Sequence, residues 1–338
     1  MALLVTGVAG FIGYHLAEAL LADGRTVLGI DSLNDYYDPK LKNARLTRLE
    51  ARPGFEFRQI NVADRQAMFA LADQSPDIET IVHLAAQAGV RYSLDNPAAY
   101  VDANVMGQLA VLELARRLPN LSHLVYASSS SVYGRNEKQP FAVGDPVERP
   151  ASVYAATKRA GELLARTYAD LYGLPVTGLR FFTVYGPWGR PDMAYYRFTR
   201  AIFEDRPIRV FNQGRMKRDF TYIDDILTGL LAAIERPPAG PGPEGGGDEA
   251  AARGDLTTHR LYNLGNHRTE PLLRFIEVLE AACGREARKE MTDMQPGDVA
   301  ETYADIASST RDLGFQPTTT IDEGLPRFVA WFRDYHGV

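Results

Sequence analysis

The heptapeptide Gly7-Val8-Ala9-Gly10-Phe11-Ile12-Gly13 sets the fold of this chain. It follows an apolar run at residues 2–6 and leads into a segment with helical spacing at 12–23. Glycine tolerates the tight turn between a strand and a helix, and its missing side chain lets a phosphate approach the backbone. The following helix would present free N–H groups to that phosphate. The heptapeptide therefore predicts a dinucleotide-binding turn.

Further apolar runs alternate with helical patterns through the first half of the chain. Continuous apolar runs between helices are typical of parallel strands that are covered on both faces. We expect helices at 12–23 and 41–50, and strands at 2–6, 26–30, 55–60, 81–84, 124–127 and 176–180. The predicted fold class is α/β, with a Rossmann-like doubly wound parallel sheet and a smaller, mixed α/β substrate-binding lobe.

The alternation ends near residue 181, where aromatic residues, prolines and arginines become dense. We predict a dinucleotide-binding domain over 1–180 and a substrate lobe over 181–338. A helix at 223–234 and a strand at 261–263 are expected to return the chain to the first domain, through segments near 222–236 and 259–266. The stretch 237–256, rich in proline, glycine and acidic residues, is predicted to be a flexible insertion.

Composition excludes several classes of protein. The 338 residues are 45% hydrophobic and 24% charged, as in ordinary soluble proteins. A net charge of −6 with scattered signs argues against a nucleic-acid partner. No apolar run approaches the roughly 20 residues that span a bilayer, and no signal-peptide pattern is found. The single cysteine, Cys283, excludes an internal disulfide and favours a cytoplasmic location. We predict no metal site.

Polar residues at the ends of the expected strands predict the cofactor. Asp31 ends the second strand, where a carboxylate can bind both ribose hydroxyls and repel a 2′-phosphate, so NAD is favoured over NADP. Asn61 ends the third strand and either meets the adenine or forms a turn. His83 is expected to be structural, and Arg25 and Lys42 are expected on the solvated surface.

The segment Tyr154-Ala155-Ala156-Thr157-Lys158 carries the candidate chemistry. Tyr154 and Lys158 share one face of a helix that begins near Ser152. A phenol has a pKa of about 10, and a nearby ammonium lowers it, so Tyr154 is a candidate general base. Ser129, at the end of the fifth strand, is the best candidate to bind the reacting oxygen. An isolated Tyr–Lys pair is usually an exposed helix face. Together with the glycine turn and the serine run 128–131, it indicates hydride transfer between a nicotinamide and an alcohol carbon.

These motifs and the longer blocks 31–38, 83–93, 126–134, 179–194 and 214–225 resemble the extended short-chain dehydrogenase/reductase family over nearly the whole chain. Within it, the resemblance is closest to UDP-glucuronate 4-epimerases. It implies tightly held NAD, a UDP-sugar substrate and a homodimer paired through helices near 98–117 and 152–172. The implied reaction is 4-epimerisation of UDP-glucuronate to UDP-galacturonate through a transient 4-keto intermediate, without decarboxylation.

The resemblance also implies site residues. Those implied for the cofactor are Gly7, Gly10, Phe11, Ile12, Gly13, Asp31, Asn34, Asn61, Val62, Leu84, Ala85, Ala86, Gln87, Asn104, Tyr154, Lys158 and Val184. Those implied for the substrate are Arg91, Ser128, Ser129, Ser130, Ser131, Thr183, Arg190, Met193, Phe211, Asn212, Arg218 and Asp298. Asn61 departs from the family, in which aspartate is frequent at this position. Gln295 replaces an arginine of UDP-galactose epimerases.

The resemblance favours an acidic sugar. Thr183 stands where relatives that act on neutral UDP-hexoses commonly carry asparagine. Ser130 and Ser131 follow Ser129, where related dehydratases and decarboxylases carry acidic residues. Together with Thr183, these two serines would donate hydrogen bonds to the sugar carboxylate.

Two alternatives stay open at this point. One is a UDP-glucose/UDP-galactose 4-epimerase. The other is a non-catalytic NAD-binding protein on the same fold, because a fold alone does not determine a function. The intact set of Tyr154, Lys158 and Ser129 argues against the second alternative.

Overall fold

The computed structural model describes residues 2–238, 258–294 and 301–338. Contacts divide the chain into two compact units, each assembled from separate stretches. The first unit comprises Met1–Val132, Ser152–Arg180 and Leu230–Tyr262, and the second comprises Tyr133–Ala151, Phe181–Gly229 and Asn263–Val338. From residue 239 onward, the predicted insertion 237–256 lies outside the described residues, as do Gln295 and Asp298.

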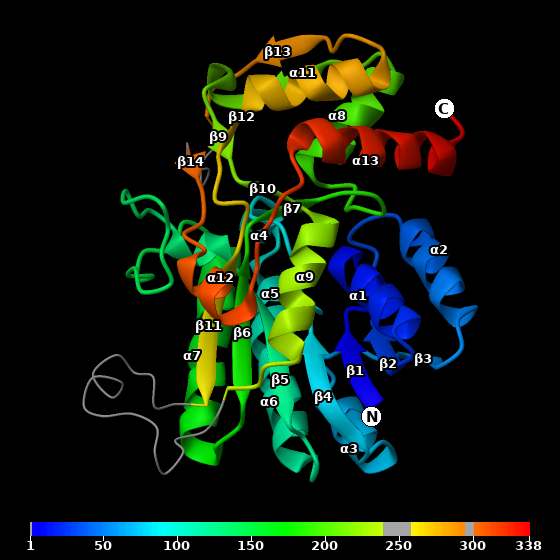
Figure 1. The fold of residues 1–338 in the computed structure, drawn as a ribbon, viewed down its shortest axis with the longest axis vertical. Helices are drawn as coiled ribbons and strands as arrows, with labels where there is room; N and C mark the ends of the chain where they lie inside the picture. Colours follow the sequence, from blue (N-terminus) through cyan, green and yellow to red (C-terminus); the bar gives the residue numbers. More distant parts are fainter. Residues whose placement is uncertain (1, 239–257, 295–300) are drawn as a thin grey trace. The chain divides into compact units, whose positions relative to one another are not determined.

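A seven-stranded sheet has the order β11-β6-β5-β4-β1-β2-β3 (Figure 1). Its strands are β1 (Ala2–Thr6), β2 (Thr26–Asp31), β3 (Phe55–Gln59), β4 (Ile78–His83), β5 (His123–Ser129), β6 (Val176–Phe181) and β11 (His259–Leu264). The pairings from β3 through β5 are parallel, and Leu4 lies opposite both Leu28 and Ile81. The strand order reverses between β1 and β4. In such sheets, ligands bind beside the loops that follow the two strands at the reversal.

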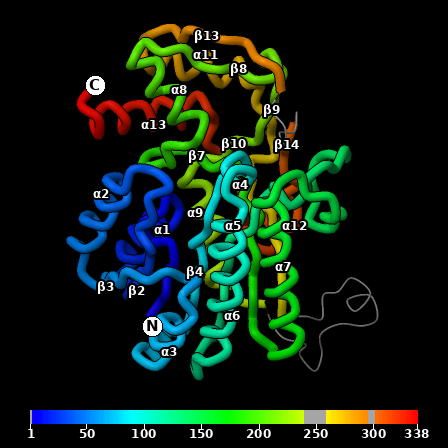
Figure 2. Tube along the Cα trace, turned by 180° about the vertical axis from the view of Figure 1, so that it is seen from behind, coloured from blue at the N-terminus to red at the C-terminus, as the bar shows by residue number. Residues whose placement is uncertain are grey.

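Helices cover both faces of this sheet (Figures 1 and 2). One face carries α1 (Phe11–Ala22) and α2 (Pro39–Glu50), and the other carries α3 (Arg65–Gln74), α6 (Gly107–Arg117) and α7 (Val153–Tyr172). Before α6, the chain forms α4 (Tyr92–Asp95), α5 (Pro97–Tyr100) and a π-helix, η1 (Val101–Met106). A short 3-10 helix, η2 (Ser130–Tyr133), follows β5, and α9 (Ile223–Ile234) crosses from the second unit to the first.

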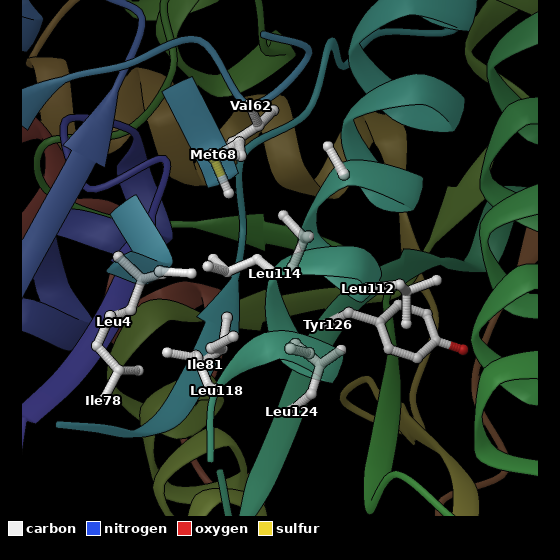
Figure 3. Close-up of a cluster of buried hydrophobic side chains, with 14 of the residues drawn as sticks. Leu4, Val62, Met68, Ile78, Ile81, Leu112, Leu114, Leu118, Leu124 and Tyr126 are labelled. Atoms are coloured by element: carbon white, nitrogen blue, oxygen red, sulfur yellow. The ribbon is translucent and has the colours of Figure 1, made fainter. Parts of the chain in front are cut away.

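The core beneath α3, α6 and α7 is mainly aliphatic, with Met68 and Tyr126 also in the cluster (Figure 3). Leu4, Ile81 and Leu124 come from neighbouring strands, Leu112 and Leu114 come from α6, and all five are buried in one cluster. Burying such a side chain fully contributes about 1.5–3 kcal/mol. This packing holds the strand ends, and the polar residues that follow them, in fixed positions.

The second unit is a mixed α/β structure with short strands. Its strands pair as β7 (Thr183–Tyr185) with β10 (Phe220–Tyr222), β8 (Ile208–Val210) with β13 (Lys289–Met291), and β9 (Lys217–Arg218) with β12 (Glu270–Pro271) and β14 (Glu301–Thr302). Its helices are α8 (Ala194–Phe203), η3 (Phe211–Gly214), α11 (Leu272–Cys283), α12 (Ala307–Leu313) and α13 (Ile321–His336). None of the described helices is long and apolar enough to cross a membrane.

The predicted strands of the sheet are present, although β4 begins three residues earlier than expected. The unit boundaries differ from the predicted ones, because Tyr133–Ala151 belongs to the second unit. There, the Tyr133 hydroxyl donates to Asn263 Oδ1 at 2.6 Å, and Asn263 Nδ2 donates to Phe141 O at 2.8 Å. These contacts join residues more than 120 positions apart, which no local pattern reveals.

Candidate active site

The glycine loop joins β1 to α1 and is held by backbone hydrogen bonds. Gly7 N donates to Ile30 O at 2.7 Å. Gly7 has a φ of +70°, and a Cβ there would lie 2.7 Å from Ala85 N. A Cβ at Gly13 would lie 2.2 Å from Gly7 O. Only glycine fits at these two positions, because the turn is left-handed at the first and the helix packs against the loop at the second.

Helix α1 begins without a side-chain cap. Its N-cap, Gly10, has no side chain to form a capping bond, and its first turn contains no acidic residue. The first-turn amides and the positive end of the helix dipole therefore remain suited to an anionic ligand. The loop, with Phe11 and Ile12 in that first turn, fits the pyrophosphate of the predicted dinucleotide.

Asp31 at the end of β2 is buried and supports the same loop. Its Oδ2 accepts from Ala9 N at 3.2 Å, and its Oδ1 accepts from Leu33 N at 2.8 Å. Each carboxylate oxygen can accept two hydrogen bonds, so both retain capacity for a ribose hydroxyl. The carboxylate thus shapes the turn and carries the negative charge that disfavours a 2′-phosphate.

Lys42 is not on the solvated surface, contrary to expectation. It is 5% exposed, and its Nζ donates to both the backbone O and the Oδ1 of Asn34 at 2.7 Å. Burial lowers the pKa of Lys42 below its ordinary value, against the opposing charge of Asp31. Arg45, which the sequence did not single out, is also buried and donates to Ala9 O at 2.7 Å. Asn34 is therefore held by α2, and its predicted cofactor contact stays a prediction.

The end of β4 is tied to the end of β1. Leu84 N donates to Thr6 O at 3.2 Å, and Ala85 N donates to Thr6 Oγ1 at 3.1 Å. His83 Nδ1 lies 2.7 Å from Thr6 Oγ1. Burial, and secondarily the ammonium of Lys158, lowers the pKa of His83 to about 3, so the ring is neutral at pH 7. These bonds fit the structural role expected for His83.

Asn104 holds the segment after β4 from the π-helix η1. Its Oδ1 accepts from Gln87 N at 2.8 Å, and its Nδ2 donates to Gln87 O at 2.9 Å and to Thr157 Oγ1 at 3.0 Å. The Asn104 amide is thus engaged by the protein, and its predicted cofactor contact stays a prediction. Asn104 positions Gln87, and Ala86 beside it, relative to α7.

Three further predicted residues of the first unit have local roles. Asn61 Oδ1 accepts from Ala63 N at 3.0 Å, which is the turn interaction anticipated as one alternative. The Val62 side chain is buried in the core cluster. Arg91 is exposed at the start of α4, and the Tyr100 hydroxyl steadies the preceding backbone by donating to Gly89 O at 2.6 Å. Their ligand contacts stay predictions.

Helix α7 carries Tyr154 and Lys158 one turn apart. Its N-cap is Ser152, whose Oγ accepts from Ala155 N at 3.1 Å. Lys158 is only 9% exposed, and its Nζ donates to Ala127 O on β5 at 3.0 Å. The Tyr154 ring meets the edge of Tyr100, with centroids 6.0 Å apart. The structure thus brings the ammonium to the strand that ends in Ser129.

The four serines after Ala127 do not share one environment. Ser129 is buried, and its Oγ accepts from Ser131 N at 3.2 Å. Ser130 and Ser131 are half-buried in η2. Ser128 Oγ instead donates to Glu162 Oε1 at 2.6 Å and is buried. Alternate strand residues point to opposite faces, and the Ser128 side chain faces α7. Its predicted substrate contact stays a prediction.

Glu162 and Arg180, which were not among the predicted site residues, form a buried ion pair beside these serines. Burial opposes ionisation of Glu162, but the hydrogen bonds and charge of Arg180, with Ser128 and Arg159, lower the pKa of the carboxyl below its ordinary value. Two signals were present: Glu162 is one turn beyond Lys158 on the same face, and Arg180 interrupts an apolar strand. A charge inside an apolar run indicates a buried partner.

In the second unit, Thr183 and Val184 lie on β7, where Val184 is buried and Thr183 half-buried. Met193 is the N-cap of α8, and its N donates to Arg190 O at 3.2 Å. The Arg190 guanidinium forms a bidentate pair with Asp192, at 3.0 Å to Oδ1 and 2.5 Å to Oδ2. The predicted sugar contacts of these residues stay predictions.

The residues predicted for the UDP group lie on β9 and η3. Arg218 is half-buried on β9, opposite Glu270 of β12 and Thr302 of β14. Asn212 has a φ of 52°, and its Nδ2 donates to Arg215 O at 2.9 Å. Left-handed backbone at a non-glycine residue is uncommon and often occurs at ligand sites. Phe211 opens this turn.

Asp219, next to Arg218, is a second buried carboxylate that sequence analysis missed. It accepts bonds from Thr221 Oγ1 (3.0 Å), Asn266 N (2.6 Å), His267 N (3.1 Å) and Ala304 N (3.1 Å). Through these bonds, two distant segments, at 266–267 and at 304, are tied to the residue that directly follows β9.

Comparison with known proteins agrees with this geometry. Residues 3–245 match the family described as the NAD dependent epimerase/dehydratase family. The chain belongs to this family. The resemblance to extended short-chain dehydrogenases/reductases and the α/β fold class predicted from the sequence are thereby confirmed.

Relatives within the family match along nearly the full chain. Protein CapI of Staphylococcus aureus is 47% identical over 339 residues, which cover 99% of each chain. A probable UDP-glucuronate 4-epimerase of Rhizobium meliloti (strain 1021) is 45% identical over 335 residues, which cover 98% of this chain and 97% of that protein. A crystal structure of UDP-glucuronic acid 4-epimerase from Bacillus cereus, in complex with UDP-glucuronic acid and NAD, has a TM-score of 0.86 and 33% identity, and the match covers 99% of this chain and 100% of that one.

Proposed function

We propose that the protein catalyses NAD-dependent 4-epimerisation of UDP-glucuronate to UDP-galacturonate, through a transient 4-keto intermediate and without decarboxylation. The observation that carries the proposal is the Lys158 contact: Nζ donates to Ala127 O, two residues before Ser129, from the helix that also carries Tyr154. Relatives in Rhizobium meliloti and Bacillus cereus bear the name of this reaction.

The first unit supplies groups that fit NAD. The glycine loop and the uncapped start of α1 hold the pyrophosphate, and Asp31 holds the ribose hydroxyls. When bound there, NAD would supply the nicotinamide ring that accepts a hydride from C4 of the sugar and gives it back. Because the cofactor is regenerated in each cycle, no second substrate is needed.

Tyr154 moves the proton. It accepts the O4 proton as the keto sugar forms and returns it after the sugar has rotated. The Lys158 ammonium favours the phenolate form of Tyr154. Ser129 donates a hydrogen bond to O4 and keeps the reacting oxygen beside the phenol.

The sugar carboxylate must survive the keto stage. A 4-keto uronate is a β-keto acid, which loses carbon dioxide when the carboxylate bond aligns with the carbonyl π system. We assign Ser130, Ser131 and Thr183 to hydrogen bonds that hold the carboxylate out of this alignment, with Arg190 assisting. Arg190 is already paired with Asp192, so its guanidinium is held in a defined orientation.

The second unit is assigned to the UDP group. Arg218 suits a pyrophosphate because its planar guanidinium can form two parallel hydrogen bonds. Phe211 and Asn212 are assigned to the uracil, Met193 to the substrate, and Asp298 to the uridine ribose. In the first unit, Arg91 and the backbone near Ser128 are also assigned to the substrate. Val184 and the backbone at 61–62 and 84–87 are assigned to NAD.

The protein is further proposed to be a cytoplasmic homodimer. Exposed apolar side chains on η1 and α7 support pairing through the helices predicted for it: Val101, Met106, Leu163, Leu171 and Tyr172. Clustered exposed apolar residues commonly mark protein interfaces. The single cysteine, which is buried, suits a reducing compartment.

The deciding experiment is NMR of purified protein mixed separately with UDP-glucuronate and UDP-glucose. Conversion of UDP-glucuronate alone to UDP-galacturonate is expected. Conversion of UDP-glucose instead would retain the mechanism and reject the acidic substrate. No conversion of either sugar, with NAD supplied, would reject the proposed function.

Two variants test the assigned roles. Tyr154→Phe is expected to retain NAD and to lose turnover by orders of magnitude, and wild-type turnover would reject the proton-transfer role.

Thr183→Val is expected to slow conversion of UDP-glucuronate or to release carbon dioxide and a UDP-pentose. An unchanged rate with no pentose would reject the carboxylate role.

A further inference from the structure

The buried ion pair of the first unit links the helix that carries Tyr154 to the sheet. Arg180 Nε donates to Glu162 Oε1 at 2.8 Å, and Arg180 Nη2 donates to Glu162 Oε2 at 2.9 Å. The two side chains are 2% and 1% exposed. A bidentate, charge-assisted pair of this kind is both strong and directional.

The Glu162 carboxylate has further partners. Ser128 Oγ donates to Oε1 at 2.6 Å, and Arg159 Nη1 donates to Oε2 at 2.9 Å. Ser128 belongs to β5 and Arg180 belongs to the neighbouring strand β6. One carboxylate on α7 therefore engages two adjacent strands at once.

The spacing of these contacts relates the helix to the reacting residues. Tyr154, Lys158 and Glu162 follow one another at intervals of four, so they lie on one helix face. On β5, Ala127 O meets Lys158 and Ser128 Oγ meets Glu162, and the next residue is Ser129. Side chains from two successive turns of α7 are thus bonded to two adjacent residues of β5. A shift of the helix along the strand would break both bonds and move Tyr154 away from its place relative to Ser129.

A contribution to the stability of the fold does not by itself explain why Glu162 and Arg180 form a buried ion pair. Removing two charges from water is costly, and well-packed apolar residues often replace a buried pair without loss of stability. Apolar side chains would fill the same space, but they would not fix the position of α7 along β5, because apolar contacts have little directionality. The ion pair supplies that direction.

We propose that Glu162, Arg180 and Ser128 form a positioning unit that sets α7 against β5 and thereby places Tyr154 and Lys158 relative to Ser129. The inference rests on the proposed function for the chemistry at Tyr154. The three residues act through the helix and need not touch the substrate.

The main test is the double variant Glu162→Leu/Arg180→Leu, assayed with the nucleotide sugar that the wild type converts. We expect it to fold, to retain NAD and to have nearly unchanged KM, with kcat at least tenfold lower. A wild-type kcat in the folded variant would overturn the proposal. A purely structural role would lower the melting temperature and leave kcat per folded molecule unchanged.

Glu56→Ala/Arg58→Ala is the matched control. This pair also joins a glutamate and an arginine in the first unit, with Arg58 Nε 2.7 Å from Glu56 Oε1. Its side chains are more exposed, at 28% for Arg58 and 61% for Glu56. Its kcat is expected to equal that of the wild type. An equal loss of kcat in the control would overturn the assignment to the buried pair.

Ser128→Ala keeps the ion pair and removes only the bond to β5. Its kcat is expected to fall two- to fivefold with KM unchanged, and an unchanged kcat would reject the link through Ser128. This variant decides the question if the double variant does not fold.

Failure of the proposed function is distinguishable from failure of this inference. A wild type that converts no nucleotide sugar rejects the function. The inference is then read from a crystal structure of the double variant, in which the contact between Lys158 Nζ and Ala127 O is expected to lengthen beyond hydrogen-bonding distance. Retention of that contact would overturn the inference.

Discussion

Glu162 in the first unit and Asp219 in the second are buried carboxylates, with exposed fractions of 1% and 0%, but their partners differ. Glu162 accepts hydrogen bonds from two arginines and a serine hydroxyl. Asp219 accepts bonds from three backbone amides and a threonine hydroxyl. The first carboxylate joins a helix to two strands through side chains, whereas the second ties loops to a strand through their backbone.

Because their partners differ, the pKa values of the two carboxyl groups shift in opposite directions. Arginine partners overcome the burial of Glu162 and lower its pKa. Burial raises the pKa of Asp219 to about 6, although the amides of Asn266, Ala304 and His267 and the Thr221 hydroxyl oppose the shift. A neighbouring cation can offset the loss of hydration of a buried carboxylate, whereas amide dipoles and a hydroxyl offset only part of it. Four measurements test this contrast.

The largest effect is expected for Glu162→Gln. The amide has nearly the same shape as the carboxylate but leaves the Arg180 charge buried without its counter-ion. Breaking one side of a buried pair typically costs about 3–5 kcal/mol. Urea unfolding should show this loss, and the Glu162→Leu/Arg180→Leu variant should lose less. A single variant no less stable than the double one would contradict the account.

Asp219→Asn should have a smaller effect on the second unit. The amide keeps one acceptor oxygen and turns an NH₂ group toward donors that Oδ2 now satisfies, those of His267 and Ala304. A buried donor left without an acceptor costs about 1–3 kcal/mol. The same urea assay measures the change. A loss equal to that of Glu162→Gln would remove the distinction between the two carboxylates.

The pH dependence should separate the two carboxylates in sign. The folded pKa of Asp219, about 6, lies above its unfolded value, so its contribution to stability grows as pH falls from about 6 toward 4. The folded pKa of Glu162 is lowered, so its contribution is present above the unfolded pKa and is lost as pH falls through the folded one.

Unfolding free energies measured between pH 7.5 and 5 therefore give the test. As pH falls from 7.5 to 5, the difference in unfolding free energy between wild type and Asp219→Asn should grow by roughly 1 kcal/mol. The corresponding difference for Glu162→Gln should stay constant over this range. At pH values below the pKa of a glutamate in the unfolded chain, the loss of unfolding free energy caused by Glu162→Gln should become smaller. Parallel curves for the two variants would refute the assigned directions.

The smallest effect is expected for Glu56→Gln, which makes the same chemical change in an exposed pair. Solvent screens the interaction between Glu56 and Arg58, so the unfolding free energy should change by less than about 0.5 kcal/mol. Urea unfolding alongside Glu162→Gln isolates the effect of burial. A loss of several kcal/mol at Glu56 would show that burial is not what distinguishes the two pairs.

Local sequence patterns were sufficient to predict the features that involve only one or two neighbouring elements. The turn at Gly7, the strand end at Asp31 and the shared helix face of Tyr154 and Lys158 follow from spacing within one or two elements. Backbone angles, dipoles and helical periodicity act over a few residues, so a sequence window contains the information.

Side-chain partners were predicted less well. Ser128 and Asn104 were expected to meet ligands, but their polar groups bond to Glu162 and Gln87. Lys42 was expected in solvent and is buried against Asn34. In each case the partner of the polar group comes from another element, and local periodicity cannot say which elements become neighbours.

The sequence by itself determined the alternation of strands and helices, the glycine turn after the first strand and the shared helix face of Tyr154 and Lys158, because these depend on short-range geometry. Only the tertiary structure decided that Glu162 would be an ionised anchor beside Arg180 and that Asp219 would be held by backbone amides. The charge state of a buried group depends on the donors that surround it, and packing brings those donors from strands and loops distant in the chain.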